Sequence, residues 1–450
     1  MDVITIETPS LGDRTYLAHD GQVALVVDPQ RDIDRVERAA ADAGVRITHV
    51  VETHVHNDYV SGGLVLSRVT GAQYRHAADE ALPFDHVGVR DGDRFAVGSL
   101  DVQVVHTPGH TPHHLSYVVR RGDEPAAVFT GGSMLYGTVG RTDLIDPDAT
   151  ADLTRSQYRS VQRLVELVGD DARVYPTHGF GSFCASASSD DESDGTIGGE
   201  REVNLALTAD DEDAFVELLL AGLDQYPKYY AHMDPLNRAG AGPVDLSPPA
   251  EVDPPELARR IHRGEWVVDL RERRAFADNH VSGTINVQLA DAFATYLAWT
   301  LPWGMPVTLL ADEPDDIVEA QRQLARVGID RPTGAADGGV DRWSGASDRS
   351  AYEVIEFADL AHRDDLRVLD VRLRGEYEES HVTGAVNVPI GDLVGRLDEV
   401  PGGPVAVHCA SGYRASIAAS LLDRAGRAVV LIDDDVEHAA AAGRGMTERT

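Results

Sequence analysis

An internal repeat in the C-terminal part of the chain constrains the fold more than any other feature of the sequence. The segment VVDLRERRAFADNHVSGTINV (267–287) matches VLDVRLRGEYEESHVTGAVNV (368–388), with aspartate, arginine, histidine, glycine and asparagine at equivalent places. Each copy continues into a second apolar run, VTLL (307–310) or VAVH (405–408), and then into a helical pattern. Short β-branched runs that alternate with helices are typical of an α/β domain. We therefore expect one α/β module to occur twice.

The length of the chain leaves room for a further domain before the repeat. A chain of 450 residues is too long to fold around a single ordinary hydrophobic core. In the N-terminal part, strand-like runs such as QVALVVDP (22–29) alternate with helical stretches. The proline-rich segment 242–257 predicts a linker, because proline resists continuation of a helix or a sheet. We predict three α/β domains, over residues 1–245, 251–348 and 351–450.

The charge of the chain limits its partners. Lysine and arginine number 40 against 75 aspartates and glutamates, for a formal net charge of -35. A field of carboxylates repels a phosphate backbone, so we expect no nucleic acid partner. Lys228 is the single lysine, and an acidic surface that favours arginine resembles proteins of salt-accumulating microbes, where salt screens the self-repulsion. We predict a halophilic protein, with an ordinary acidic soluble protein as the alternative.

Cysteine content and hydropathy predict the compartment. Only Cys184 and Cys409 occur, too few for a disulfide framework, which favours a reducing cytoplasm. The N-terminus lacks a basic start followed by an apolar run, and no run of about 18 apolar residues occurs, so we expect neither a signal peptide nor a membrane partner. We expect a soluble, cytoplasmic protein that forms a homo-oligomer of unspecified size.

The second repeat places a cysteine in the chemical setting that a thiolate requires. In VAVHCASGYRAS a strand ends at His408, Cys409 opens a glycine-containing loop, and a helix begins near Arg414. Backbone N–H groups, the positive end of a helix dipole and an arginine stabilise a thiolate and also hold an anionic substrate. We predict Cys409 and Arg414 as catalytic residues, with an inert buried cysteine as the alternative. The predicted substrate-binding residues of the loop are Ala410, Ser411, Gly412 and Tyr413.

The motifs LDVRLRGEYEESHVTGAVNVP and HCASGYR together resemble the rhodanese family of sulfurtransferases. The resemblance implies that Cys409 accepts sulfur and that the loop following it is an anion pocket. Asp370, Arg372 and His381 match scaffold positions of the family, so we expect them to support the loops and not to catalyse.

The first repeat departs from this pattern at the reactive loop. Aligning the strands places Ala311 at the cysteine position and Asp316 at the arginine position. Carboxylates in this loop repel anionic sulfur donors. We predict that the first repeat is inactive and is retained for packing or for presenting its neighbour.

The N-terminal domain contains histidines at three strand-to-loop junctions. The stretch THVHNDY places His54, His56 and Asp58 together after one strand, and His110 and His178 follow two others. Side chains at i and i+2 point the same way, so His54 and His56 can reach one ion. Any one of these histidines alone is more often structural, but together they predict a metal site.

Four motifs occur in this domain: ETHVHNDYVSGG, HTPGHTPHHLSY, FTGGSMLYGTVGRTDL and YPTHGFGSFC. They resemble the metallo-β-lactamase superfamily, and within it the branch of persulfide dioxygenases and hydroxyacylglutathione hydrolases. The resemblance implies an αββα sandwich, followed here by two rhodanese-like α/β domains with parallel sheets.

Two positions depart from the superfamily pattern. Tyr59 stands where a histidine usually follows the motif aspartate, and Gly132 replaces the metal-binding aspartate of the TGD motif. A dinuclear hydrolase needs both groups, whereas a mononuclear non-haem iron typically needs two histidines and one carboxylate. The resemblance therefore implies Fe²⁺, with Zn²⁺ as the alternative, and His54 and His110 as ligands.

The third ligand position stays open in the sequence. Asp58, His56, His178 or water fills it in the simplest hypotheses, and Asp143 is a remoter candidate. In a further alternative the domain has lost its metal and survives as a scaffold.

The sequence predicts an enzyme of sulfur metabolism. In this hypothesis the N-terminal domain oxidises a low-molecular-weight persulfide with O2 to sulfite and thiol at a mononuclear iron, and Cys409 moves sulfane sulfur from a persulfide or thiosulfate. Tyr59 and Cys184 are predicted to contact substrate, with a packed aromatic residue and a buried thiol as the alternatives. Two other hypotheses are a thiolester hydrolase of the hydroxyacylglutathione type and a metal-free sulfur carrier in which only Cys409 reacts.

Overall fold

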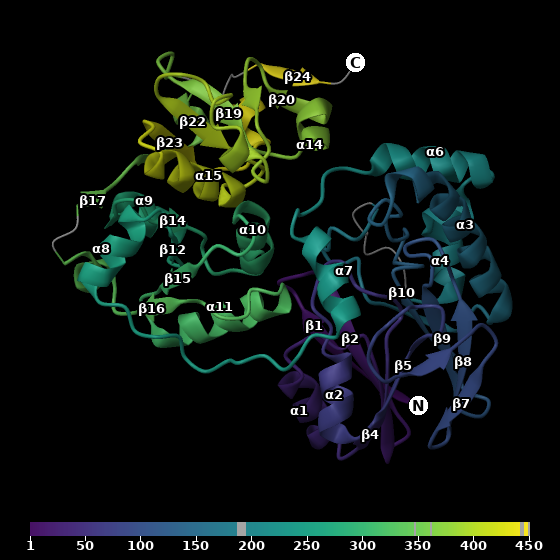
Figure 1. Ribbon diagram of the computed structural model, residues 1–450. Coiled ribbons are helices and arrows are strands. Elements are labelled where there is room, and N and C mark those ends of the chain that lie inside the picture. Colours follow the sequence, from purple (N-terminus) through teal and green to yellow (C-terminus); the bar gives the residue numbers. More distant parts are fainter. Residues whose placement is uncertain (187–194, 346–347, 361, 442–444, 449–450) are drawn as a thin grey trace. The chain divides into compact units, whose positions relative to one another are not determined.

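The computed structural model describes residues 1–186, 195–345, 348–360, 362–441 and 445–448. It divides into two compact units, which we describe separately (Figure 1). Unit 1 consists of Met1–Val244 with Ala325–Gly328, and unit 2 consists of Asp245–Leu324 with Ile329–Thr450. The described helices include none that is both long and apolar enough to cross a bilayer.

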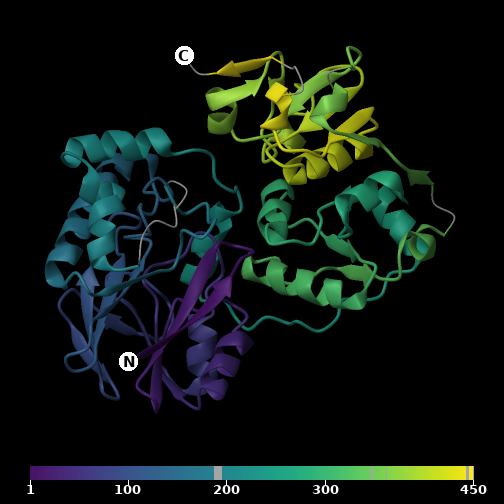
Figure 2. The same ribbon diagram turned by 180° about the vertical axis from the view of Figure 1, so that it is seen from behind.

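Unit 1 contains two β-sheets. The first has the order β1-β2-β3-β4-β5-β6, with antiparallel pairing up to β3 and parallel pairing from β3 onward. Figure 2 shows the antiparallel β1–β2 pair from behind. The strands are β1 (Asp2–Thr8), β2 (Asp13–His19), β3 (Val23–Val27), β4 (Arg46–Val51), β5 (Gln73–Ala77) and β6 (Val87–Val89).

The second sheet has the order β11-β10-β9-β8-β7 and is antiparallel except for the β10–β11 pair. Its strands are β7 (Arg94–Val97), β8 (Leu100–His106), β9 (Leu115–Arg120), β10 (Ala127–Gly131) and β11 (Arg173–Pro176). The helices of unit 1 are α1 (Asp34–Asp42), α2 (Gly63–Thr70), η1 (Pro147–Ala149), α3 (Thr150–Leu167), α4 (Ile197–Val203), α5 (Leu205–Thr208), α6 (Glu212–Gly222) and α7 (Tyr230–Ala239).

Three apolar clusters hold these layers together. One lies between the sheets and includes Leu25, Val104 and Phe129. A second joins α1 and α2 to the outer face of the first sheet, and a third joins α3 and α6 to the outer face of the second. The buried apolar residues of these helices therefore cover the outer faces of the two sheets. The order helix, sheet, sheet, helix confirms the predicted αββα sandwich.

The strand order of unit 1 brings distant chain segments to one place. Strands β3 and β4 are parallel, so Asp28 and His54 leave the first sheet at the same edge. Strands β10 and β11 are also parallel, so Gly132 and His178 leave the second sheet together. His110 lies in the connection between β8 and β9. The predicted metal site therefore has to form where these strand ends of the two sheets meet.

Unit 2 contains both copies of the repeat, each with a parallel sheet. The first sheet has the order β14-β12-β15-β16 and the second β18-β23-β22-β19-β21. The strands are β12 (Trp266–Asp269), β13 (His280–Val281), β14 (Ile285–Asn286), β15 (Val307–Leu310), β16 (Gly334–Ala336), β17 (Arg349–Ser350), β18 (Glu353–Ile355), β19 (Arg367–Asp370), β20 (Ser380–Val382), β21 (Val386–Asn387), β22 (Val405–His408), β23 (Val429–Ile432) and β24 (Met446–Glu448).

The helices of unit 2 are α8 (Pro254–His262), α9 (Arg273–Asp278), α10 (Phe293–Thr300), α11 (Pro314–Arg326), α12 (Val340–Ser344), α13 (Phe357–Leu360), α14 (Arg374–Glu379), η2 (Leu393–Gly395), α15 (Tyr413–Arg424) and α16 (His438–Ala441). The predicted linker is shorter than expected, because Asp253 caps α8 and two prolines form its first turn. Proline is tolerated there, since the first N–H groups of a helix have no intrahelical partner.

The β-ladders confirm the alignment of the two repeats. Asp269 pairs with Leu310 in the first sheet, and Asp370 pairs with His408 at the equivalent place in the second. The residue that follows Leu310 is Ala311, which therefore occupies the position of the cysteine in the second copy.

Candidate functional site

His54 is held so that one ring nitrogen faces the site. Thr53 Oγ1 donates its proton to Asp28 Oδ2 at 2.7 Å, so it accepts the N–H of His54 Nδ1 at 2.8 Å. A neutral imidazole carries one ring proton, so His54 Nε2 keeps its lone pair. Burial holds the pKa of His54 well below its usual value, and the ring is therefore neutral.

His178 faces His54 across the site. Its Nδ1 lies 2.8 Å from Asp13 Oδ1 and 3.1 Å from Asp58 Oδ2, while its Nε2 lies 3.3 Å from His54 Nε2. Two ring nitrogens this close are bridged either by a hydrogen atom, in an N–H···N hydrogen bond, or by a metal ion. Nitrogens bound at about 2.0–2.1 Å to one tetrahedral ion lie roughly 3.3–3.4 Å apart. The observed separation therefore fits a shared metal ion.

The carboxylates behind His178 set its charge in the metal-free protein. Burial lowers the pKa of His178, but Asp58 and Asp13 raise it well above its usual value. Burial and the Asp58 carboxylate raise the pKa of Asp13 to about 8. His178 therefore carries a proton that it can donate to His54, and a divalent ion would take the place of this proton.

His110 presents another unused nitrogen. Its Nδ1 lies 2.7 Å from the carbonyl oxygen of Arg141, which can only accept, so the lone pair stays on Nε2. The side chain is fully buried, and Nε2 has no hydrogen-bond partner among the described residues. Burial lowers the pKa of His110 to about 3. A neutral, buried imidazole with an unused lone pair fits a metal ligand.

His56 is the fourth predicted histidine of the cluster and lies beside His54 and His178. Its Nε2 lies 3.2 Å from Glu52 Oε2 and 3.0 Å from the Tyr59 hydroxyl, and its Nδ1 has no hydrogen-bond partner in the described chain. The ligand atoms of His54, His56 and His178 all lie within 4.8 Å of one another. The Tyr59 ring stacks on His56 with centroids 4.3 Å apart. Tyr59 therefore orients His56, and its contact with substrate stays a prediction.

The backbone at Gly132 determines how many ions the site can hold. A side-chain carbon at Gly132 would lie 2.2 Å from His110 Cδ2, so the His110 ring fills the space that an aspartate would need. The N–H of Gly132 donates to His114 Nε2 at 3.0 Å. Gly132 therefore offers no carboxylate to bridge two ions, which favours a single ion.

The other predicted ligands have different surroundings. Asp58 accepts from His178 Nδ1 at 3.1 Å, so it supports that ring from behind. Asp143 is bound by Arg141 through two contacts of 2.7 and 2.8 Å, which engages both of its oxygens. Cys184 forms a second group with His110 and His178, with ligand atoms within 4.8 Å of one another.

The Cys409 loop occupies the start of a helix in unit 2. Cys409 directly follows β22 and is 1% exposed. Helix α15 begins at Tyr413, and the first N–H groups of a helix have no intrahelical acceptor. The residue before it, Gly412, has φ +90° and no side chain to cap them; a side-chain carbon there would lie 2.1 Å from Asp433 Oδ1. These N–H groups can therefore donate hydrogen bonds to a bound anion.

Arg414 is paired with a carboxylate. Its Nη2 donates to Glu376 Oε1 at 2.7 Å, and its Nη1 donates to the other oxygen. Burial opposes ionisation of Glu376, but Arg414 lowers its pKa below the usual value. The pair fixes the guanidinium and reduces the positive charge of the pocket. Sequence reasoning missed Glu376, because nothing local marks it as a partner of a residue 38 positions away.

The first repeat contributes to the surroundings of this loop. The Tyr413 hydroxyl donates to the carbonyl oxygen of Gln288 at 2.8 Å, and the ring of Tyr296 on α10 lies 5.8 Å from the Tyr413 ring. Arg273 Nε donates at 2.6 Å to Asp433 Oδ1, the atom that packs against the loop glycine. These contacts agree with the expectation that the first copy presents its neighbour.

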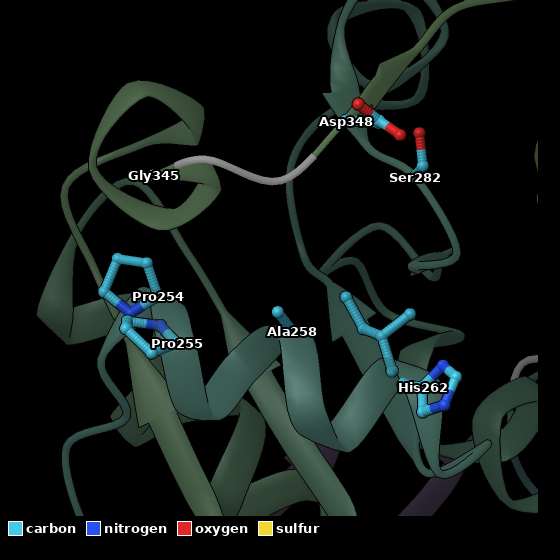
Figure 3. Close-up of a pocket in the computed structure, with 8 residues that line it drawn as sticks. Pro254, Pro255, Ala258, His262, Ser282, Gly345 and Asp348 are labelled. Atoms are coloured by element: carbon cyan, nitrogen blue, oxygen red, sulfur yellow. The ribbon is translucent and has the colours of Figure 1, made fainter.

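The first repeat also has a pocket of about 720 Å³ (Figure 3). The figure shows proline residues and Ala258 along α8, with Ser282 and Asp348 on the opposite side. The lining includes neither Ala311 nor Asp316. The pocket is therefore not the counterpart of the Cys409 loop.

Comparisons with known proteins identify a domain around each site. The model of the metallo-beta-lactamase superfamily matches residues 14–179. Residues 14–179 therefore form a domain of the metallo-beta-lactamase superfamily. A model of the rhodanese-like domain matches residues 353–441, so this superfamily domain is followed by a rhodanese-like domain in the same chain.

Individual relatives support the superfamily assignment. Human mitochondrial persulfide dioxygenase ETHE1 is 28% identical over 209 residues, which cover 46% of this chain and 75% of that protein. The hydroxyacylglutathione hydrolase of Cereibacter sphaeroides is 31% identical over 176 residues, covering 38% of this chain and 64% of that protein. The crystal structure of a metallo-beta-lactamase from Staphylococcus aureus has a TM-score of 0.66 at 25% identity and covers 74% of this chain and 98% of that one.

Sequence reasoning missed three groups in the metallo-beta-lactamase domain, namely Asp13, Asp28 and His114. Asp28 directly follows β3, as the histidine motif follows β4, so the same strand-end rule would have found it. His114 lies inside a motif that the sequence analysis quoted. No local signal distinguishes Asp13 from the other acidic residues of the chain.

Proposed function

We propose that this protein oxidises a low-molecular-weight persulfide with O2 at a single iron ion in unit 1, and transfers sulfane sulfur through Cys409 in unit 2. In the first reaction RSSH, O2 and H2O give RSH, sulfite and two protons. The persulfide dioxygenase relative and the rhodanese-like domain both support a role in sulfur metabolism. Which thiol carries the sulfur is left open by this proposal.

The observation that carries the proposal is the 3.3 Å separation of His54 Nε2 and His178 Nε2. Together with His110 Nε2, these atoms offer three imidazole ligands once an ion replaces the proton on His178, and imidazole suits both iron and zinc. Gly132 disfavours the second ion of a two-metal hydrolase. Iron, when bound, supplies the redox chemistry that couples O2 to the persulfide sulfur.

The residues of the chain hold the ligands in place. Asp13 and Asp58 fix the ring of His178, and the carbonyl of Arg141 fixes that of His110. Asn237 of α7 donates to two carbonyl groups of the His56 loop at 2.8 Å each. Such outer contacts set the orientation of each ring before substrate binds.

In the second reaction the Cys409 thiolate attacks the sulfane sulfur of thiosulfate. The S–S bond of thiosulfate breaks, sulfite leaves with the bonding electron pair, and Cys409 becomes a persulfide. A thiolate acceptor then takes the outer sulfur and restores the Cys409 thiolate. The start of α15 and Arg414 stabilise the anions in this loop.

Metal analysis combined with an activity assay tests the first reaction. The full chain is purified, its iron and zinc contents are measured, and O2 uptake is followed with a persulfide substrate. We expect about one iron per chain and persulfide-dependent O2 uptake, both lost in His54→Ala and retained in His113→Ala. His113 is a suitable control because it lies near His110 in sequence but is partly exposed.

Two outcomes contradict the proposal. Zinc with cleavage of a glutathione thiolester would establish the hydrolase hypothesis. Protein that binds no transition metal, yet transfers sulfur through Cys409, would establish the metal-free carrier.

A further inference from the structure

The proposed metal centre lacks an anionic ligand at the position of Gly132. The His110 ring occupies the space beside this glycine, so a carboxylate cannot simply be restored there. Imidazole ligands bring no negative charge to a divalent ion, and the carboxylates of Asp13 and Asp58 contact Nδ1 of His178. An anionic ligand from another part of the chain would bring negative charge to the ion itself.

Cys184 is in the right place to supply that ligand. It is fully buried, and its sulfur lies within 4.8 Å of the ligand nitrogens of both His110 and His178. His110 Nε2 is also fully buried and has no hydrogen-bond partner among the described residues, which is an independent sign that a ligand belongs here. His178 is shared with the cluster of His54 and His56, so both groups surround the same ring.

The main chain fixes Cys184 and His110 together. The N–H of Arg141 donates to the carbonyl oxygen of Cys184 at 2.9 Å, and the carbonyl of Arg141 accepts from His110 Nδ1 at 2.7 Å. The N–H of Cys184 donates to Ser182 Oγ at 3.2 Å. Arg141 therefore helps to position both Cys184 and the His110 imidazole, as expected for two ligands of one ion.

We propose that the thiolate of Cys184 binds the metal ion together with His110 and His178, in place of the carboxylate that Gly132 cannot provide. On binding, the S–H bond breaks, a sulfur–metal bond forms, and the proton passes to solvent. A thiolate with imidazoles suits Fe²⁺ or Zn²⁺ and not Mg²⁺ or Ca²⁺. The inference rests on the proposed metal centre and specifies its ligands.

X-ray absorption of the metal-loaded full chain tests this assignment without relying on activity. Zn²⁺ or Fe²⁺ is added to the metal-free protein in the absence of persulfide. We expect a sulfur neighbour at about 2.3 Å from the metal. Cys184→Ser removes this neighbour and weakens metal binding at least roughly tenfold.

The matched control is Cys409→Ser, because the chain has only two cysteines. A sulfur neighbour that persists in Cys409→Ser and disappears in Cys184→Ser identifies Cys184 as its source. Thermal unfolding of Cys184→Ser and wild type, both without metal, shows whether the variant is folded. Cys184→Ala is the second variant if serine itself binds the ion.

The failures of the two proposals are distinguishable. A metal ion bound by the histidines with no sulfur neighbour in wild type overturns the Cys184 assignment and leaves the persulfide oxidation intact. A protein that binds no metal ion at all overturns both.

Discussion

The two repeats of unit 2 share a framework but differ in the loop that performs chemistry. In each copy an arginine binds an aspartate two residues earlier through contacts of 2.7–3.1 Å, as Arg271 does with Asp269 and Arg372 with Asp370. In each copy a histidine bonds the carbonyl four residues earlier at 2.8 Å and stacks on an aromatic ring. Both copies therefore keep the same contacts, and a supporting role for Asp370, Arg372 and His381 stays a prediction.

The loops have opposite electrostatic character. The second copy has Cys409, then a left-handed Gly412, then a helix start next to Arg414. The first copy has Ala311, and its helix α11 starts at Pro314 and has Asp315 and Asp316 in its first turn. Acidic residues suit a helix start but occupy the place an anionic substrate would use. The comparison shows that the fold tolerates either loop, and we expect only the loop of the second copy to transfer sulfur.

The largest effect is expected from Cys409→Ser. Sulfur transfer from thiosulfate should fall by roughly 10³-fold or more, because serine is a far weaker nucleophile at neutral pH. O2 uptake on persulfide should continue, since the proposed metal centre lies in unit 1. Both rates are measured on the same preparation. If O2 uptake also vanished in the folded protein, the two reactions would not be separate.

Arg271→Ala and Arg372→Ala test whether the framework is equally important in both copies. Each leaves a buried aspartate without its cation, which should lower the free energy of unfolding by about 3–5 kcal/mol. Denaturant unfolding measures both variants. Arg263→Ala, which removes an exposed pair with Glu265, should cost at most about 1 kcal/mol. A large loss in one copy only would contradict a shared framework.

Gly412→Ala tests the geometry of the reactive loop. Its φ of +90° is unfavourable for alanine, and the new carbon would lie 2.1 Å from Asp433 Oδ1. We expect a loss of about 1–3 kcal/mol in the free energy of unfolding, together with weaker sulfur transfer. Gly402→Ala is the control, because no atom lies within 4 Å of a side-chain carbon there. Equal stabilities of the two variants would contradict the constraint.

The smallest effect is expected from Ala311→Cys in the Cys409→Ser background. The added thiol stands at the equivalent place in the first copy, but the acidic start of α11 disfavours a thiolate and repels thiosulfate. Sulfur transfer should stay below roughly 1% of the wild-type rate. A substantial recovery would show that the cysteine alone distinguishes the two repeats.

The αββα order of the first unit was expected from the resemblance of its motifs to the metallo-β-lactamase superfamily. The sequence by itself determined the repeat and the strand ends that carry His54, His110 and Cys409. These features depend on local patterns: alternation, glycine and proline positions, and residue types that follow a strand. The same rules predicted that Ala311 replaces the nucleophile, and the β-ladders confirm that register.

Tertiary structure alone decided which partners hold the functional groups. His178 is oriented by Asp13, which is 165 positions away, and Arg414 is paired with Glu376 through the packing of α14 against the loop. The ring of His110 fills the space at Gly132, although nothing in the sequence links these positions. Such contacts depend on how strands from distant segments meet at one edge, and that arrangement is set by packing of the whole domain, which no local pattern encodes.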